Sequence, residues 1–431
     1  MGYFSHIILA LAAVIAAEAG FEAGWDQPFA LILLLPIPHL LAKWIRKQSL
    51  LGKFRVLAIG TKVLTYSPIA LQVVAVSVFG WLASVEDWLG VGGIGVNEAS
   101  TDLSEFAIIL SLVPFIVFEF IAIDARSRLF ASNTNEIAKL RSFQYRMLLS
   151  GLVPLGIYML LASVLSFNPT LRAHVEEIEI FYMLFVVLSV AIFVLTLPAI
   201  LRNTWETEPL TEGVAFHVLI DVARRANFQC RRLLVWKTGY QVSNAAILGF
   251  TLKQRAVLFT DSLLAELSPR ELAAVYAHEI GHARCRHVQF FAAWTIAFFL
   301  SADLFLALFE TKVEWLSLTI TAALFVSWYL GFGYLSRRFE LEADLESLAI
   351  TGDGEALLSA LDTVGGGAAR NRPSWRHFST AKRALFMSAS IRDPRVGERL
   401  RASLRRWKVI GISIFVIAAV GKLAAMSMLW N

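Results

Sequence analysis

The stretch Leu272–His287 reads LAAVYAHEIGHARCRH. It contains the pattern H-E-x-x-H, in which His278 and His282 enclose Glu279. In a helix, residues four apart share one face, so both imidazoles can bind the same metal ion. Zinc lowers the pKa of a water molecule that it binds to about 7, and the enclosed glutamate can take up the proton. The stretch therefore predicts a helix that carries two zinc ligands and a general base.

The residues before this stretch predict where the helix begins. Ser268 is placed as the N-cap, Pro269 as the first helical residue and Glu271 as the partner in a capping box. A glycine inside the pattern, Gly281, permits close approach by another element. We therefore expect both histidines on a long helix with a defined start.

A catalytic zinc needs a third protein ligand, which must come from another segment. Glu340, in the stretch SRRFELEADLESL, is the candidate, and Asp344 follows one helical turn later, placed to orient a ligand histidine. Glu342 is the rival ligand, although it falls on the other face of the helix. A solvated acidic helix is the alternative interpretation of this stretch. His287, five residues past His282, is expected to rotate away from the metal, to the surface or the membrane boundary.

The composition predicts the fold class. Of the 431 residues, 57% are hydrophobic and 17% charged, against roughly 45–50% and 25% in ordinary soluble domains. This excess excludes a simple soluble domain and predicts a mainly α, polytopic helical membrane protein. About nine segments have the length that a transmembrane helix needs: 4–20, 28–44, 63–85, 105–124, 147–167, 178–201, 288–309, 314–334 and 409–429.

Charge between the apolar segments predicts the topology. Basic residues fill the connections 43–55 and 126–146, whereas the connection 86–105 is acidic, so the positive-inside rule places the first two in the cytoplasm. Two longer polar regions then also face the cytoplasm and flank a hairpin of two spans, which brings them together. The predicted division is a membrane domain of about six spans at 1–201, a soluble domain at 202–408 interrupted by a membrane hairpin at 288–334, and a final span at 409–431.

Other classes of protein fit the sequence poorly. The net charge is +5, but the basic residues lie between apolar segments, so nucleic acid is not an expected partner. Cys230 and Cys285 form no disulfide framework or zinc-type pair. The first apolar segment lacks a basic leader and a cleavage site, and we interpret it as a retained helix. Acidic residues within spans indicate either a functional pathway or buried, hydrogen-bonded acids: Glu18, Glu119 and Asp303.

Together, HEIGH, the hairpin and SRRFELEAD resemble the zinc metallopeptidases of family M48, which includes membrane proteases of the HtpX and Ste24 kinds. The resemblance covers roughly 205–400 and implies a small cytoplasmic α+β domain of the gluzincin type. It implies one zinc ion per chain. The implied roles are metal ligand for His278, His282 and Glu340, catalytic base for Glu279, and support of a ligand for Asp344.

The stretch VSNAAILGF is similar to the substrate-binding strand of this family, with Asn244, Ala245 and Gly249 at the matching positions. Alternating apolar residues here and the run Val257–Thr260 predict two short strands. The edge of such a sheet can bind an extended substrate through backbone hydrogen bonds. An ordinary hairpin is the alternative, and Asn244 would then serve the turn.

The family also has a late H-P-x-x-x-x-R element, from which this chain departs. His377 and Arg383 keep the histidine and the spacing, but Phe378 replaces the proline. The later Asp393–Arg399 has the proline and the arginine without the histidine. Because only a donor can stabilise developing negative charge, we favour His377 as the oxyanion donor. A structural role for His377 is the alternative.

These features predict a membrane-embedded zinc metalloendopeptidase of the EC 3.4.24 class in a bacterial inner membrane, with its active site on the cytoplasmic side. The expected partners are the lipid bilayer and protein or peptide substrates that are themselves membrane proteins, as in HtpX-like quality control. A Ste24-like processing protease is the first alternative, and a nonenzymatic receptor, scaffold or transporter with a regulatory zinc domain is the second. An intramembrane protease is a third, but Arg270 and Arg284 flank the metal helix with charge. No oligomeric state follows from the sequence.

Overall fold

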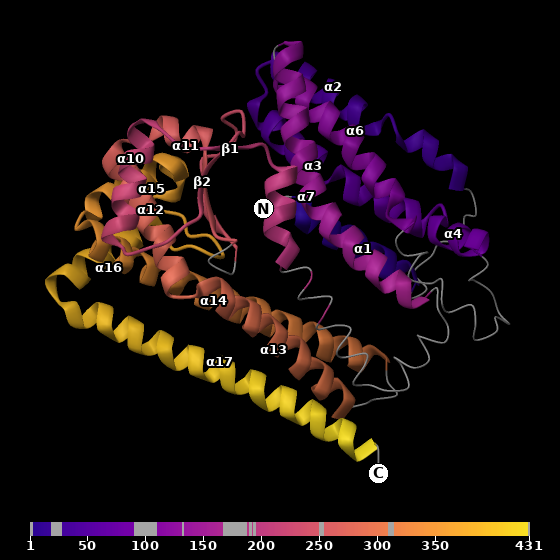
Figure 1. Ribbon diagram of the computed structural model, residues 1–431. Coiled ribbons are helices and arrows are strands. Elements are labelled where there is room, and N and C mark those ends of the chain that lie inside the picture. The colour runs from indigo at the N-terminus through magenta and orange to yellow at the C-terminus, as the bar shows by residue number, and fades with distance from the viewer. Residues whose placement is uncertain are drawn as a thin grey trace. The chain divides into compact units, whose positions relative to one another are not determined.

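Helices dominate the described part of the protein, together with one small sheet, as the composition predicts. The structure is a computed structural model and describes residues 3–18, 28–89, 110–131, 133–166, 188, 192, 195–249, 254–308 and 314–429. The chain divides into two compact units, Met1–Glu206 and Thr207–Asn431 (Figure 1). The predicted three-part division of the chain stays a prediction.

The first unit is a bundle of apolar helices. Its core gathers side chains from helices far apart in the sequence, among them Ile7, Val76 and Phe115, which are almost completely buried. The described elements are α1 (Tyr3–Glu18), the 3-10 helix η1 (Pro28–Leu34), α2 (Ile37–Leu50), α3 (Phe54–Ser77), α4 (Trp81–Leu89), α6 (Val113–Phe130) and α7 (Thr134–Ser166).

Two segments among the described residues are long and apolar enough to cross a bilayer, Phe29–Leu50 and Phe54–Ser77. The first overlaps most of the predicted span 28–44, whereas the second overlaps the predicted span 63–85 only at 63–77. Most of the predicted span 178–201 lies outside the described residues. The structure therefore supports a helical, apolar chain, and the count of nine spans stays a prediction.

Glu119 lies buried inside this first unit and is paired. Nδ1 of His6 lies 2.5 Å from one of its carboxylate oxygens, and a guanidinium nitrogen of Arg126 lies 3.4 Å from the other. Of the two interpretations offered by the sequence, the buried and hydrogen-bonded acid is the one that describes Glu119. The side chains of Glu18 and Asp303 lie outside the described residues.

The second unit contains a four-stranded sheet of order β1-β2-β4-β3. β2 and β4 are parallel, whereas the β1–β2 and β3–β4 pairs are antiparallel. The two strands predicted from alternating apolar residues are confirmed, and β3 lies at the edge of the sheet. The strands are β1 (Thr207–Pro209), β2 (Arg232–Trp236), β3 (Ala245–Leu248) and β4 (Ala256–Thr260).

Helices surround this sheet and extend away from it. In Figure 1, the long helices α13 and α14 run side by side, and α17 packs along α13. The helices of the unit are α10 (Gly213–Arg225), α11 (Asp261–Glu266), α12 (Pro269–Arg284), α13 (His287–Leu308), α14 (Glu314–Thr351), α15 (Gly354–Ala369), α16 (Thr380–Arg392) and α17 (Pro394–Leu429).

The core of the second unit fixes the orientation of α12. Tyr276 and Ile280 on this helix are fully buried against the sheet, and the ring of Tyr276 meets Phe259 of β4 edge to face at 5.5 Å. Residues two positions further along a helix point to a different side. His278 and His282 therefore face away from the sheet, toward α14.

Candidate metal centre

The helix that carries the two candidate metal ligands begins where the sequence predicts. The side chain of Ser268 accepts a hydrogen bond from the backbone of Glu271, and Glu271 in turn accepts one from the backbone of Ser268, which completes the capping box. Pro269 occupies the first helical position. This cap satisfies backbone donors that would otherwise be unpaired. It fixes the register of α12, and with it the face that carries the histidines.

A close contact between α12 and α14 brings the third residue into reach. A Cβ atom added to Gly281 would lie 2.9 Å from Cβ of Glu346 and 3.0 Å from Cα of Ala343. Only glycine leaves room for the backbone of α14 at this point. The expected role of Gly281 in close packing is confirmed, and the contact places Glu340 beside the two histidines.

Replacing Gly281 by Ala should therefore destabilise the second unit. The neighbouring atoms are backbone and Cβ atoms that cannot rotate away, so we expect a loss of about 1–3 kcal/mol of unfolding free energy. Urea unfolding of the purified protein in detergent, followed by tryptophan fluorescence, measures it. Gly354→Ala is the control, because its added Cβ would meet its nearest neighbour at an ordinary 3.5 Å. Equal stability of the two variants would contradict the packing argument.

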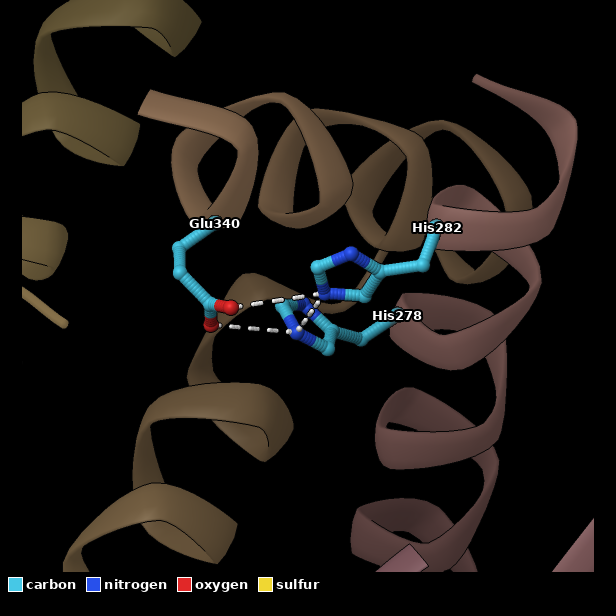
Figure 2. Close-up of side chains that lie close together, drawn as sticks. All are labelled: His278, His282 and Glu340. Atoms are coloured by element: carbon cyan, nitrogen blue, oxygen red, sulfur yellow. Dashed lines mark hydrogen bonds and ion pairs between the residues drawn. The ribbon is translucent and has the colours of Figure 1, made fainter. Parts of the chain in front are cut away.

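The side chains of His278, His282 and Glu340 converge on one point (Figure 2). Nε2 of His278 and Nε2 of His282 lie 3.1 Å apart. One carboxylate oxygen of Glu340 lies 3.6 Å from Nε2 of His278, and the other lies 3.5 Å from Nε2 of His282. The structure thus brings together the three predicted metal ligands, one from α14 and two from α12.

This triangle has the dimensions of a zinc site. Zinc binds nitrogen and oxygen at about 2.0–2.1 Å, so two donors of a tetrahedral site lie about 3.3 Å apart. The three measured separations lie within a few tenths of an ångström of that value. Two imidazoles and one carboxylate are also a ligand set typical of catalytic zinc. The residues present therefore fit a zinc ion.

Asp344 holds His278 in the required protonation state. Its carboxylate is completely buried and lies 3.0 Å from Nδ1 of His278. A carboxylate only accepts hydrogen bonds, so Nδ1 carries the proton and Nε2 keeps its lone pair for a metal. Arg383 anchors the carboxylate by donating to both of its oxygens. The placement of Asp344 agrees with its predicted role, and the contact with Arg383 was not foreseen.

Charge in the centre is suited to a cation. Burial alone would lower the pKa of His278, but the carboxylates of Asp344 and Glu340 outweigh it and raise this pKa to about 9. Burial opposes ionisation of Glu340, yet hydrogen bonds from His278 and His377 hold its pKa well below the usual range. The negative charge of these carboxylates therefore favours a positive charge at the centre, which is either the second proton of His278 or a metal ion that displaces it.

The structure corrects the expectation for His287. This side chain is 1% exposed, and its Nδ1 lies 2.8 Å from Nδ1 of His282. The prediction assumed that the helix continues past His282, but α12 ends at Arg284, and Arg286 adopts a φ of +56° before α13 begins. This turn brings His287 back behind His282. Glu342, the rival ligand, lies on the same side and accepts a hydrogen bond from His287.

Glu279 lines a cavity of about 450 Å³ beside the three ligands. Burial raises the pKa of Glu279 to about 7, with His278 opposing the shift and the Glu340 carboxylate adding to it. A group whose pKa lies near neutrality can both accept and return a proton. The position is the one that the sequence predicts for a general base.

The edge strand β3 forms one wall of this cavity, which Asn244, Ala245 and Gly249 all line. Two hydrogen bonds to Thr260 hold the backbone of Asn244. The amide of Asn244 donates to the hydroxyl of Thr260, and its carbonyl oxygen accepts from the amide of Thr260. Gly249 has a φ of +95°, and a Cβ there would lie 2.6 Å from the carbonyl oxygen of Gln254. Glycine is required at this position for both reasons. A role in substrate binding stays a prediction for all three residues.

His377 reaches the centre from the segment before α16. Its Nδ1 lies 3.1 Å from a carboxylate oxygen of Glu340, and its ring is half-exposed toward the cavity. Because Glu340 can only accept, Nδ1 carries a proton. Donation to an oxyanion then needs a second proton on Nε2. The structure places His377 where it was expected, and its oxyanion role stays a prediction.

A second cavity, of about 360 Å³, meets the first at His278, Glu279 and His377. Most of its remaining wall is apolar, formed by Leu263, Val275, Leu357, Ala360, Leu361 and Val364. An apolar pocket beside a reacting centre accepts an apolar side chain of a ligand. Nothing in the sequence marks this pocket, because its apolar residues come from three separate helices.

Comparisons with known proteins agree with this geometry. Residues 212–404 match the model of peptidase family M48. A "Protease HtpX homolog" of Thermoplasma acidophilum is 26% identical over 210 residues, which cover 46% of this chain and 65% of that protein. A homologue of the same name from Burkholderia multivorans is 29% identical over 173 residues, covering 38% and 59%. The chain thus spans less than two thirds of the length of these relatives.

Among solved structures, the crystal structure of S. mikatae Ste24p matches 87% of this chain and 97% of that chain, with 16% identity and a TM-score of 0.49. The family model is the more informative comparison, because it matches a defined range. That range includes every residue of the candidate centre, from Asn244 to Arg383. Over residues 212–404, the chain is therefore similar to peptidase family M48.

Proposed function

We propose that the protein is a zinc-dependent metalloendopeptidase of the membrane. The observation that carries this proposal is the triangle of His278, His282 and Glu340 with Glu279 beside it, at the junction of two cavities. A nonenzymatic metal site needs the three ligands but has no need of a carboxylate poised at neutral pH. The intact base therefore favours an enzyme over a scaffold or receptor.

The chain supplies most of the chemistry that peptide hydrolysis requires. When bound, zinc would polarise the scissile carbonyl and make a water molecule easier to deprotonate. Glu279 takes the proton from the attacking water and returns it to the leaving amine. His377, at the edge of the same cavity, is placed to donate to the developing oxyanion once it is doubly protonated. Asp344 keeps Nε2 of His278 directed at the metal.

Substrate binding is proposed at the edge strand β3. Its outer edge is unpaired among the described residues, and it borders the cavity that contains Glu279. An extended peptide can add to such an edge by backbone hydrogen bonds, which makes binding largely independent of sequence. The second, apolar cavity would then accept one apolar side chain next to the cleaved bond.

The substrates are proposed to be membrane proteins or membrane-attached peptides. Helix α14 is continuous from Glu314 to Thr351, so its apolar first half leads without a break to Glu340. At 1.5 Å per residue, Glu340 lies about 9 Å beyond the end of the predicted span at Tyr334. A site so close to an apolar helix favours substrates held in the same bilayer. HtpX-like quality control at the cytoplasmic surface of a bacterial inner membrane agrees with this position, and Ste24-like processing is the alternative.

Removal of zinc tests the proposed activity. Treatment of the detergent-purified protein with a chelator should reduce hydrolysis of casein or of a reconstituted membrane protein to background, because no side chain of the centre can replace the metal. Adding back one equivalent of zinc should restore hydrolysis. Cleavage is measured by gel electrophoresis and mass spectrometry. Hydrolysis that persists in verified metal-free protein would contradict the proposal.

A further inference from the structure

A chain of hydrogen bonds runs from the metal ligand His282 to the C-terminal helix. Nδ1 of His282 lies 2.8 Å from Nδ1 of His287, and Nε2 of His287 lies 2.8 Å from a carboxylate oxygen of Glu342. The ammonium of Lys408, on α17, donates to the same oxygen at 3.1 Å. Four helices, α12, α13, α14 and α17, thus meet behind the candidate metal ligands.

The two central residues of this hydrogen-bond chain are shielded from water. His287 is 1% exposed and Glu342 is 6% exposed. The ring of His287 stacks on Phe339 with centroids 4.1 Å apart and planes 9° apart. The ammonium of Lys408 lies over the ring of Phe339, 5.1 Å from its centroid. With water excluded, each polar group depends on the partner that the structure gives it. The geometry of these side chains is therefore closely determined.

The carboxylate of Glu342 determines which ring nitrogens of His287 and His282 carry a proton. Glu342 can only accept, so Nε2 of His287 carries the proton. The neutral ring of His287 then has an unprotonated Nδ1, which must accept from Nδ1 of His282. With its proton on Nδ1, His282 presents a bare Nε2 to the metal. Glu342 thus determines the tautomer of His282 through the intervening ring of His287.

The arrangement repeats, by different residues, what Asp344 and Arg383 do for His278. There, a buried carboxylate anchored by a guanidinium lies directly beside Nδ1 of the histidine, at 3.0 Å. Here, a buried carboxylate anchored by an ammonium accepts through an intervening imidazole. We propose that His287 and Glu342 are positioning residues that hold His282 in its metal-binding tautomer and orientation, and that Lys408 fixes Glu342. This inference rests on the proposed zinc function.

A second metal ion is the rival explanation, because donor atoms of Cys285, His287 and Glu342 lie within 4.8 Å of one another. Two observations oppose it. Both nitrogens of His287 already have partners. The ammonium of Lys408 also lies at this cluster, bonded to Glu342 and to the carbonyl oxygen of Cys285, where it would repel a cation.

The test measures zinc binding in the full-length protein, by competition with a chelator of known affinity. His287→Phe keeps a planar ring that can stack on Phe339 but removes the acceptor for His282. Its dissociation constant for zinc is expected to rise about 10–100-fold, as is usual when the partner of a ligand histidine is lost. Glu342→Leu should weaken binding similarly, and Glu342→Gln less, because the amide oxygen still accepts from His287.

Glu346→Gln is the matched control. Glu346 lies one turn further along α14 and also pairs with a cation of α17, at 2.9 Å from Arg401, without reaching a histidine. Its zinc affinity should equal that of the parent. Substitution by cobalt gives a second readout, since the visible absorption of the metal reports its ligands: the spectrum should change in His287→Phe and not in Glu346→Gln. Metal analysis should find one ion per chain.

The outcomes are distinguishable. Parent affinity and an unchanged cobalt spectrum in folded His287→Phe would overturn the inference while leaving the proposed function intact, as would equal losses in Glu342→Leu and Glu346→Gln. Two ions per chain in the parent, falling to one in His287→Phe, would support the second metal instead. If His287→Phe does not fold by circular dichroism, the comparison of Glu342→Leu, Glu342→Gln and Glu346→Gln decides. A parent that binds no zinc would overturn both proposals.

Discussion

Replacing Glu279 by Gln is expected to lower kcat about 10²–10⁴-fold, the range that a general base contributes. The amide keeps the shape of the side chain but cannot accept a proton from water. Glu279 is not among the three converging ligands, so the variant should bind zinc as tightly as the parent. Single-turnover hydrolysis of a fluorogenic peptide, with metal content measured on the same sample, separates the two effects. Full activity of the zinc-loaded variant would remove Glu279 from the mechanism.

The pH dependence of the parent enzyme provides an independent check on the same residue. Burial raises the pKa of Glu279 to about 7, and the base must be ionised to accept a proton. Activity should therefore fall about tenfold per pH unit below the pKa of Glu279, which bound zinc would lower from this value because a cation favours the ionised carboxylate. Zinc content has to be followed at each pH, because protonation of the ligands would also reduce activity. The Glu279→Gln variant should lack this acidic limb in whatever activity remains.

The residues of the centre that could be predicted are those close together in the sequence or joined by a short connection. The spacing of His278 and His282 depends only on helical periodicity, and the cap at Ser268 shows that the helix begins before them. Glu340 lies far along the chain, but the intervening hairpin of two apolar segments returns the chain to its starting point. Helical periodicity and the similar lengths of the two apolar segments were therefore sufficient to predict that these three residues lie together.

The supporting residues required information that a single sequence does not contain. His287 was placed on the wrong side because nothing in the sequence marks Arg286 as the residue that adopts a positive φ. Only two features of the sequence indicated supporting residues: His287, a histidine just after the motif, and Glu342, a second glutamate near Glu340. Lys408 is more than sixty residues from Glu342, and its contact depends on how α17 packs. Tertiary packing thus decides which polar residues support the metal ligands.

Arg383→Met is expected to destabilise the second unit by about 3–5 kcal/mol, the cost of leaving a buried charge without its partner. Arg383 is 4% exposed and donates to both oxygens of Asp344, which is completely buried. Methionine fills a similar volume, so the loss of stability would come from the missing positive charge and not from a cavity. Urea unfolding of the metal-free protein measures the effect. Adding Asp344→Asn to the variant should recover part of the stability, because the uncompensated charge is then absent.

The exposed pair Arg270–Asp353 provides the matched control for that substitution. Its guanidinium also makes two hydrogen bonds to a carboxylate, but in solvent, so Arg270→Met should leave the unfolding free energy unchanged within error. Equal losses in the two variants would show that burial is not the cause.

The pH dependence of the Arg383→Met effect identifies Asp344 as its origin. Burial alone would raise the pKa of Asp344, but Arg383 and His278 outweigh it and lower this pKa below 3.8 in the folded protein. A carboxyl group with a lowered pKa stabilises the fold above its unfolded value, and that contribution is lost as the pH falls through the folded pKa. Without Arg383, burial is opposed by His278 alone, and Asp344 should protonate at a higher pH. The parent and Arg383→Met should therefore differ most near neutral pH and converge on acidification, whereas a packing defect would give a difference that is independent of pH.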